Sequence, residues 1–197
     1  MKRNPIFLTK KLTSRREKFT WWQGTLFLIA ISIIGRLATG DPEESREQYE
    51  EEKTPPWSPP SWLFGVAWPI NNIFLTWAGI RLLNARKRFP NRDSLLQLQG
   101  MHWLIFITFG WAYFRKRSPW LAALWTQADA LVALQSYRLA REGDAKLARA
   151  YLPLNAWTWF ASTIAWYQAL YNPDPLLDTS APLKKSRKKK RTLKFWE

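Results

Sequence analysis

The side chains that could do chemistry in this chain of 197 residues are few and lie far apart in the sequence. The chain has one histidine, His102, and no cysteine, so it can form neither a disulfide nor a thiolate or multi-histidine metal site. No glycine-rich phosphate loop and no Gly-x-Ser-x-Gly elbow occurs. The sequence therefore does not indicate a hydrolase or a phosphoryl-transfer enzyme. We expect no metal site and no required cofactor.

Tryptophan provides most of the remaining binding chemistry, because the chain has 14 of these residues. An indole ring offers a wide stacking face and one N–H donor, a combination that suits a flat apolar ligand. Trp68 and Asn72 are four positions apart, as are Trp157 and Ala161, so each pair shares one face of a helix. Interfacial belts and helix packing are expected to account for about half of the tryptophans.

Five runs with no charge, or with a single one, predict the elements that position these side chains. Each run is close to the roughly 20 residues that a helix needs to cross a bilayer, and each includes tryptophan, glycine or polar residues suited to helix–helix packing. The runs cover residues 19–35, 54–80, 94–114, 118–137 and 150–173. We predict an all-α integral membrane protein, a multi-pass bundle of five transmembrane helices, rather than a soluble tryptophan-rich protein.

One aspartate and one histidine fall inside the predicted spans. A charged carboxylate costs about 2.5–3.5 kcal/mol at the centre of a span, so Asp129 requires compensation. It could take part in ligand or proton handling, or it could form a structural hydrogen bond to a neighbouring tryptophan or serine. His102 lies beside polar Gln97 and Gln99. We interpret it as a hydrogen-bonded or interfacial residue rather than as a haem ligand.

The polar segments outside the spans give the predicted domain organisation. Residues 1–18 form a basic N-terminal segment, residues 19–173 the transmembrane domain, and residues 174–197 a basic tail. The first loop, residues 40–61, is acidic and then proline-rich, which indicates a structured cap or linker. The net charge of +15 is concentrated in part at Lys184 to Lys194. This cluster predicts binding to anionic lipid headgroups, since each basic residue near a negatively charged membrane surface contributes about 1 kcal/mol to binding. A nucleic-acid partner is not expected.

Charge also bears on orientation and processing. The basic N-terminal segment shares a side with the loops after the second and fourth spans, which favours a cytoplasmic N-terminus. Five spans then place the basic tail outside, against the same tendency. Arg15 and Arg16 precede the first apolar run, but no clear cleavage site follows it, so we predict a retained first helix.

From about residue 49 to residue 172 the chain resembles the tryptophan-rich sensory protein or peripheral-type benzodiazepine receptor family, also called translocator protein (TspO/MBR). Two blocks carry the resemblance, namely Tyr49, Trp57, Pro59, Pro60, Gly65 and Trp68, and then Pro153, Trp157, Phe160, Ala161 and Asn172. Leu154 stands where the family usually has tyrosine, and Ala165 where it has asparagine. The resemblance thus implies a divergent member whose ligand preference differs from that of better-known relatives.

This resemblance implies a five-helix bundle, usually dimeric, with a pocket between helices that the first loop covers. Such proteins bind porphyrins, haem-related tetrapyrroles and in some cases sterols. The resemblance assigns Trp57, Trp68, Asn72, Trp157, Phe160 and Ala161 to ligand binding, and Tyr49, Lys53, Pro59 and Pro60 to the lid. Lys53 is a candidate partner for the carboxylates of a tetrapyrrole.

Three functions stay open on this basis. The first is a membrane receptor, sensor or transporter for a hydrophobic tetrapyrrole-like ligand, such as a porphyrin, haem or a sterol. The second is a light-dependent porphyrin-degrading enzyme that would use the indoles of Trp68 and Trp157. The third is a membrane assembly or scaffold factor that acts through the charged loop and tail. These residues do not establish catalysis, and no catalytic residue is assigned.

Overall fold

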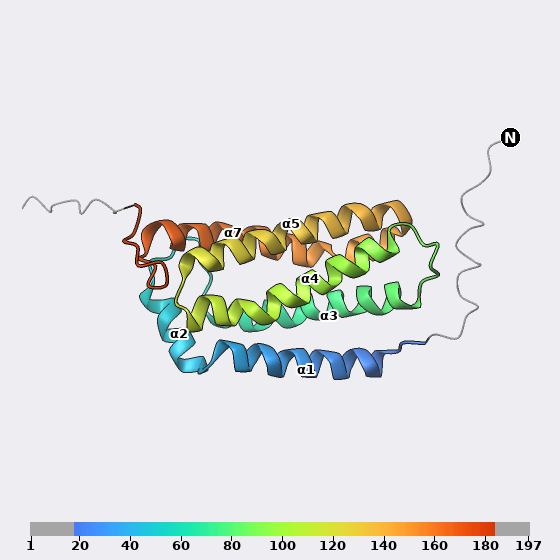
Figure 1. The fold of residues 1–197 in the computed structure, drawn as a ribbon, viewed down its shortest axis with the longest axis horizontal. Coiled ribbons are helices and arrows are strands. Elements are labelled where there is room, and N and C mark those ends of the chain that lie inside the picture. Colours follow the sequence, from blue (N-terminus) through green and yellow to red (C-terminus); the bar gives the residue numbers. More distant parts are fainter. Residues whose placement is uncertain (1–17, 184–197) are drawn as a thin grey trace, which may run out of the picture.

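The computed structural model describes residues 18–183, and five long helices account for most of them. These helices are α1 (Trp21–Thr39), α3 (Trp62–Asn84), α4 (Arg92–Gly110), α5 (Pro119–Gly143) and α7 (Leu152–Tyr171). They run side by side along one axis (Figure 1). The prediction of an all-α bundle of five long helices is confirmed. The predicted headgroup-binding cluster at Lys184 to Lys194 lies outside the described residues.

Three short elements complete the described part. They are α2 (Pro42–Glu51), α6 (Ala145–Ala150) and the π-helical turn η2 (Trp111–Arg115), which continues α4. The first loop, predicted over residues 40–61, therefore contains a helix. The Asp41 side chain caps α2 by accepting hydrogen bonds from the amides of Glu43 and Glu44, and Pro42 occupies its first turn. Acidic residues in the first turn further favour this helix.

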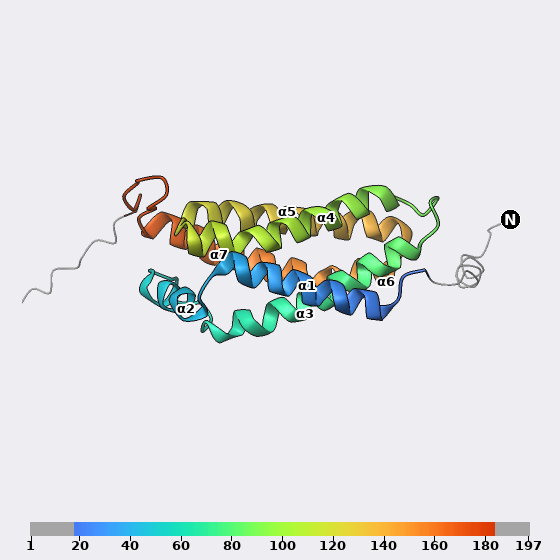
Figure 2. The same ribbon diagram turned by 60° about the horizontal axis from the view of Figure 1, so that its bottom comes forward.

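Contacts between the long helices close a ring in the order α1, α3, α7, α5, α4 and back to α1, with an additional contact between α3 and α4. Figure 2 shows the same arrangement from a second side. The most extensive contact joins α5 and α7. Ala123, Ala165 and Ala169 are buried between these two helices, and such small side chains allow close backbone approach.

A leucine–alanine core fills the end of the bundle that lies beside α6. We use this name for the buried cluster of Leu75, Ala78, Leu82, Leu95, Ala133, Ala140, Leu147, Ala148, Ala150, Tyr151 and Leu154. The cluster draws on α3, α4, α5, α6 and α7, so it holds five elements together at one end. Burial of each leucine side chain contributes about 1.5–3 kcal/mol relative to an exposed one.

The outer surface of the bundle is apolar over much of its length. By length and composition, α1 and α3 could each cross a membrane, with a mean hydropathy of 1.3. Large apolar side chains are more than half exposed on four long helices, among them Trp22, Leu26, Ile33, Leu37, Trp62, Leu104 and Leu131. A monomeric soluble protein rarely exposes so large an apolar surface. The surface is suited to lipid.

Candidate functional site

An aromatic row of partly buried rings crosses the bundle from α2 to α1. In order of contact it consists of Tyr49, Phe64, Trp157, Trp68, Phe106, Trp103 and Phe27. Neighbouring ring centroids lie between 4.9 and 6.4 Å apart, mostly edge to face. Each such pair contributes about 0.5–1.5 kcal/mol beyond the burial of its area. The row therefore joins five elements through aromatic contacts.

Trp157 is the member of this row whose indole N–H is both buried and without a partner in the described part of the chain. Its ring lies 6.4 Å from that of Trp68 and 5.4 Å from that of Phe64. Its Nε1 atom is buried and has no hydrogen-bond partner within residues 18–183. An unsatisfied buried donor costs about 1–3 kcal/mol, so native structures rarely keep one without a reason. The indole N–H can therefore serve an acceptor that enters the space between α3 and α7.

The other helix residues assigned to ligand binding by the sequence lie around this point. Asn72 is buried one turn after Trp68, and Ala161 is buried one turn after Trp157. The Phe160 ring lies 6.0 Å from the Trp157 ring and is 36% exposed, so it lies at the edge of the group. The structure thus brings Trp68 and Trp157 into contact and places the remaining residues on adjoining turns.

Residues 53–61, which we call the lid, are fixed to the bundle at several points. The Lys53 amide donates to Asn172 Oδ1 at 2.8 Å, and Asn172 Nδ2 donates back to the Lys53 carbonyl at 3.0 Å. Trp57 Nε1 donates to Thr163 Oγ1 at 3.1 Å. The Tyr49 hydroxyl donates to the Pro59 carbonyl at 3.2 Å. These bonds hold the lid against α7 and α2.

The proposed lid residues differ in exposure. Pro59 is half-buried, whereas Pro60 and Lys53 are exposed, so only the backbone of Lys53 takes part in the contacts with α7. Trp57 is 52% exposed, with its ring 6.2 Å from that of Tyr167. It therefore lies on the outer side of α7 rather than inside the ring.

A half-buried carboxylate, Glu52, anchors the base of the lid. Glu52 Oε2 accepts hydrogen bonds from the Tyr113 hydroxyl at 2.8 Å and from Gln168 Nε2 at 2.9 Å. Burial raises the pKa of the Glu52 carboxyl, although its hydrogen bonds with Tyr113 and Gln48 counteract part of this rise. The network links α2 with η2 and α7.

The aspartate and the histidine of the spans form a pair. His102 Nδ1 lies 2.6 Å from Asp129 Oδ1, and both residues are buried. The compensation for Asp129 is thus a histidine on α4, not a neighbouring tryptophan or serine. Ser136 Oγ lies 3.4 Å from the other ring nitrogen of His102. The three groups resemble a hydrolase triad in their order, but Ser136 is fully buried and no substrate can reach it in this structure.

Several residues of the site were not among those predicted from the sequence. Phe64, Phe106, Trp103 and Phe27 complete the aromatic row, and Gln168 supports the lid. Phe64 lies four positions before Trp68, and Gln168 four before Asn172, so helical spacing could have indicated both. Nothing in the sequence relates Phe106 to Trp68, since that contact depends on how α3 packs against α4.

Comparison with protein families supports this architecture. A family model described as the TspO/MBR family matches residues 24–170, which include all five long helices in whole or in large part. A comparison with curated proteins found no match. Proteins of the TspO/MBR family span the membrane several times and bind hydrophobic ligands such as porphyrins. The chain belongs to the TspO/MBR family of multi-pass integral membrane proteins.

Proposed function

We propose that this protein is a membrane receptor, sensor or transporter that binds a porphyrin, haem or a sterol between α3 and α7, beneath the lid. The ligand would contact Trp68 and Trp157 with its flat face. Asn72, Phe160 and Ala161 would line the adjoining turns. Large aromatic walls with few polar groups are typical of sites for apolar ligands.

The observation that carries this proposal is the unpartnered Nε1 of Trp157. It is the only buried side-chain N–H without a partner within the described part of the chain, and it lies on the helix that the family resemblance assigns to the pocket. A ring nitrogen, carboxylate or hydroxyl of the ligand would accept this hydrogen bond. Binding would thereby remove the cost of an unsatisfied donor.

Entry of such a ligand requires movement. The rings of Trp68, Trp157 and Phe64 contact one another in this structure, so they must part to admit a macrocycle. The lid leads into the start of α3 at Trp62 and is bonded to α7 at Thr163 and to Asn172 at its end, so we expect the lid to open first. Binding would then select a conformation in which the lid is released and the aromatic row is divided.

Tryptophan-fluorescence titration of the detergent-purified protein with protoporphyrin IX tests this proposal. We expect saturable micromolar quenching, after correction for inner-filter absorption, that weakens about tenfold in Trp157→Phe because a buried hydrogen bond is lost. Trp68→Phe should weaken binding less, since phenylalanine keeps a stacking face.

Trp120→Phe is the matched control. Trp120 lies on α5 with its ring 5.9 Å from that of Trp166, away from the aromatic row. Its substitution should leave the affinity unchanged. Linear quenching, or a loss of affinity in Trp120→Phe equal to that in Trp157→Phe, would show that the porphyrin does not bind between α3 and α7.

A further inference from the structure

A second cavity lies at the lid end of the bundle, outside the aromatic row. It has a volume of about 390 Å³, within the roughly 300–1,000 Å³ range of small-molecule sites. The end of α1, the first turns of α2 and the end of η2 with the link to α5 surround it. Its lining residues are Thr39, Gly40, Asp41, Glu44, Ser45, Gln48, Phe114, Arg115 and Arg117. This lining is mainly polar and carries charges of both signs.

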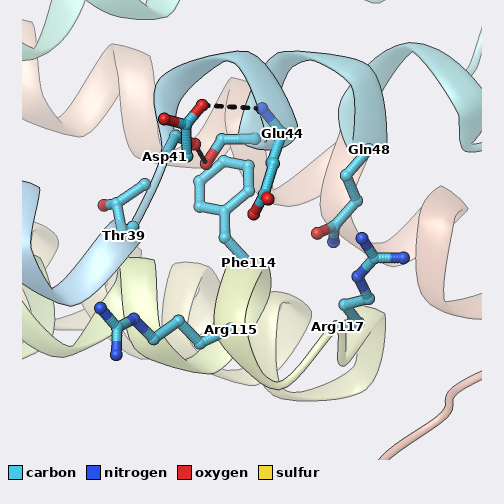
Figure 3. A pocket seen from close by; sticks show the side chains of 9 residues that line it. Thr39, Asp41, Glu44, Gln48, Phe114, Arg115 and Arg117 are labelled. Carbon is cyan, nitrogen blue, oxygen red and sulfur yellow. Dashed lines mark hydrogen bonds between the residues drawn. The ribbon is translucent and has the colours of Figure 1, made fainter.

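The charges in this cavity are not paired with each other. Arg115 donates to the Leu37 carbonyl at 3.0 Å, and no ion pair within residues 18–183 joins Arg115 or Arg117 to Asp41 or Glu44. Figure 3 shows Arg115 and Arg117 on opposite sides of Phe114, with the Glu44 side chain between that ring and Gln48. The Asp41 carboxylate is already used, because it caps α2. The remaining N–H groups of Arg115, the Arg117 guanidinium and the Glu44 carboxylate are therefore available to a ligand.

The level of the cavity along the bundle indicates which ligand would reach it. It lies where α1 ends, close to exposed Leu37, and exposed Ile33 and Ile34 lie one turn before Leu37 on the same helix. Lys116 lies over the Trp111 ring, 5.3 Å from its centroid, and Trp111 is 43% exposed. An exposed tryptophan beside a basic residue is typical of the membrane–water interface. The cavity thus lies at the level of the lipid headgroups, and the exposed apolar face of α1 leads to it.

We propose that this cavity binds the headgroup of a phospholipid that carries both a phosphate and a primary amine. Arg115 and Arg117 would donate to the phosphate oxygens, since a guanidinium matches phosphate geometry. Glu44 would accept hydrogen bonds from the ammonium group. The acyl chains would lie on the exposed apolar face of α1. The site is separate from the tetrapyrrole site, so neither proposal depends on the other.

Native mass spectrometry of the delipidated full chain with added lipid tests this inference. Phosphatidylethanolamine, phosphatidylglycerol and phosphatidylcholine are compared at equal concentration. The first has phosphate and a hydrogen-bonding amine, the second lacks the amine, and the third has an amine that cannot donate. We expect the wild type to retain phosphatidylethanolamine in preference to both others.

Three variants test which residues contact the phosphate and the amine of the lipid headgroup. Arg115→Gln with Arg117→Gln should lower retention of phosphatidylethanolamine and phosphatidylglycerol alike, by about tenfold or more, because charge-assisted bonds to phosphate are lost. Glu44→Gln should remove the preference for phosphatidylethanolamine over phosphatidylglycerol. Lys116→Gln, which removes a neighbouring charge outside the cavity lining, should change neither quantity.

Four results would overturn the inference. One is a wild type that shows no preference among the three lipids, and another is a Lys116→Gln variant that loses as much lipid as the double arginine variant. Binding of water-soluble phosphoethanolamine as tightly as of the lipid would exclude a lipid site, since the acyl chains would then add nothing. Because Arg115 also contacts α1, the double variant could loosen that helix. Glu44→Gln serves as the independent test, and an unchanged lipid preference in that variant would also refute the assignment.

Discussion

The half of the bundle beside α6 and the half beside the lid are filled by different side chains. The first contains the leucine–alanine core, and the buried His102–Asp129 pair lies beside it, with the His102 ring stacked on that of Tyr151. The aromatic row, with the unpartnered indole N–H of Trp157, packs against this core through Trp68 and Trp103 and continues to Tyr49 on α2, and the lid end holds a polar cavity. Small and aliphatic side chains pack densely, whereas a row of large rings can separate and admit a ligand. We infer that one half provides stability and the other provides binding.

The substitution with the largest expected effect lies in the half that we infer provides stability. Asp129→Ala removes the carboxylate that lies 2.6 Å from His102 Nδ1 and leaves a buried imidazole without its partner. We expect a loss of about 3–5 kcal/mol in the free energy of unfolding. Thermal unfolding in detergent, followed by size-exclusion chromatography, measures it.

The double variant His102→Ala with Asp129→Ala is the control. It should lose less stability than the sum of the single variants, because the two residues contact each other. If Asp129→Ala left stability unchanged and instead abolished porphyrin binding, the pair would belong to the binding half and the comparison would be wrong.

The next largest effect is expected where the end of α1 packs closely against the end of α4, at the lid end of the bundle. A Cβ atom at Gly110 would overlap Thr39 Oγ1 and lie 2.9 Å from the Thr39 Cα atom, so the backbone of α1 would have to move. We expect Gly110→Ala to lower the free energy of unfolding by about 1–3 kcal/mol. Denaturant titration of the detergent-solubilised protein checks it.

Gly100→Ala, also on α4, is matched to this change. A Cβ atom at Gly100 would meet no other heavy atom within 4 Å. The substitution should be neutral or stabilise the helix by up to about 1 kcal/mol. Equal effects of the two substitutions would contradict the close packing of α1 against the end of α4.

The lid should respond to the loss of its amide clamp without global unfolding. Asn172→Ala removes the two hydrogen bonds to the Lys53 backbone, at 2.8 and 3.0 Å. Each such bond contributes about 0.5–1.5 kcal/mol, so we expect roughly tenfold faster tryptic cleavage after Lys53. Porphyrin association should also accelerate.

Asn84 offers a control, because its side-chain amide also bonds a backbone segment, at the opposite end of the bundle from the lid. Its side chain accepts from the Phe19 amide at 3.0 Å and donates to the Phe19 carbonyl at 2.7 Å. Asn84→Ala should leave cleavage after Lys53 unchanged. Faster cleavage in both variants would indicate general loosening rather than a local opening of the lid.

The smallest expected effect is a pH dependence of amide exchange at Lys53. Because burial raises the pKa of Glu52, which directly precedes the lid, this carboxyl binds a proton more tightly in the folded protein than in the unfolded chain. The stability that this proton gives is fully present below the unfolded pKa of about 4.5 and is lost as pH rises through the higher folded value. Exchange of the Lys53 amide, corrected for its intrinsic rate, should therefore become faster as pH rises through this range.

Glu52→Gln removes the titrating group but keeps an oxygen acceptor for Tyr113 and Gln168. This variant should show no such pH dependence. A pH dependence that persists in the variant would assign the effect to another group.

Much of the fold could be predicted from the sequence, because uncharged runs of about 20 residues leave few alternatives to membrane helices. The helix in the acidic arm was not predicted, since Asp41 and Pro42 act there through local capping rather than apolar periodicity. The α5 helix extends past the predicted residue 137 to Gly143, because charged residues can continue a helix beyond the membrane.

The site could be predicted less completely. The contact of Trp68 with Trp157 follows from the family resemblance, and helical spacing places Asn72 and Ala161 near them. The pairing of His102 with Asp129 joins residues 27 positions apart on two helices, and only the rotation of each helix about its axis brings them together. The cavity beside α2 depends on that same unpredicted helix.

Indole NMR of the ¹⁵N-labelled protein tests most directly whether Trp157 lies at the binding site. The Trp157 signal is assigned by its absence in Trp157→Phe, and spectra are compared with and without saturating protoporphyrin IX. We predict that the Trp157 Nε1–H signal shifts strongly on binding, because the buried donor gains an acceptor or a neighbouring macrocycle, while the Trp120 signal stays in place. An unchanged Trp157 signal, with shifts confined to exposed residues such as Trp22 and Trp62, would contradict a site between α3 and α7.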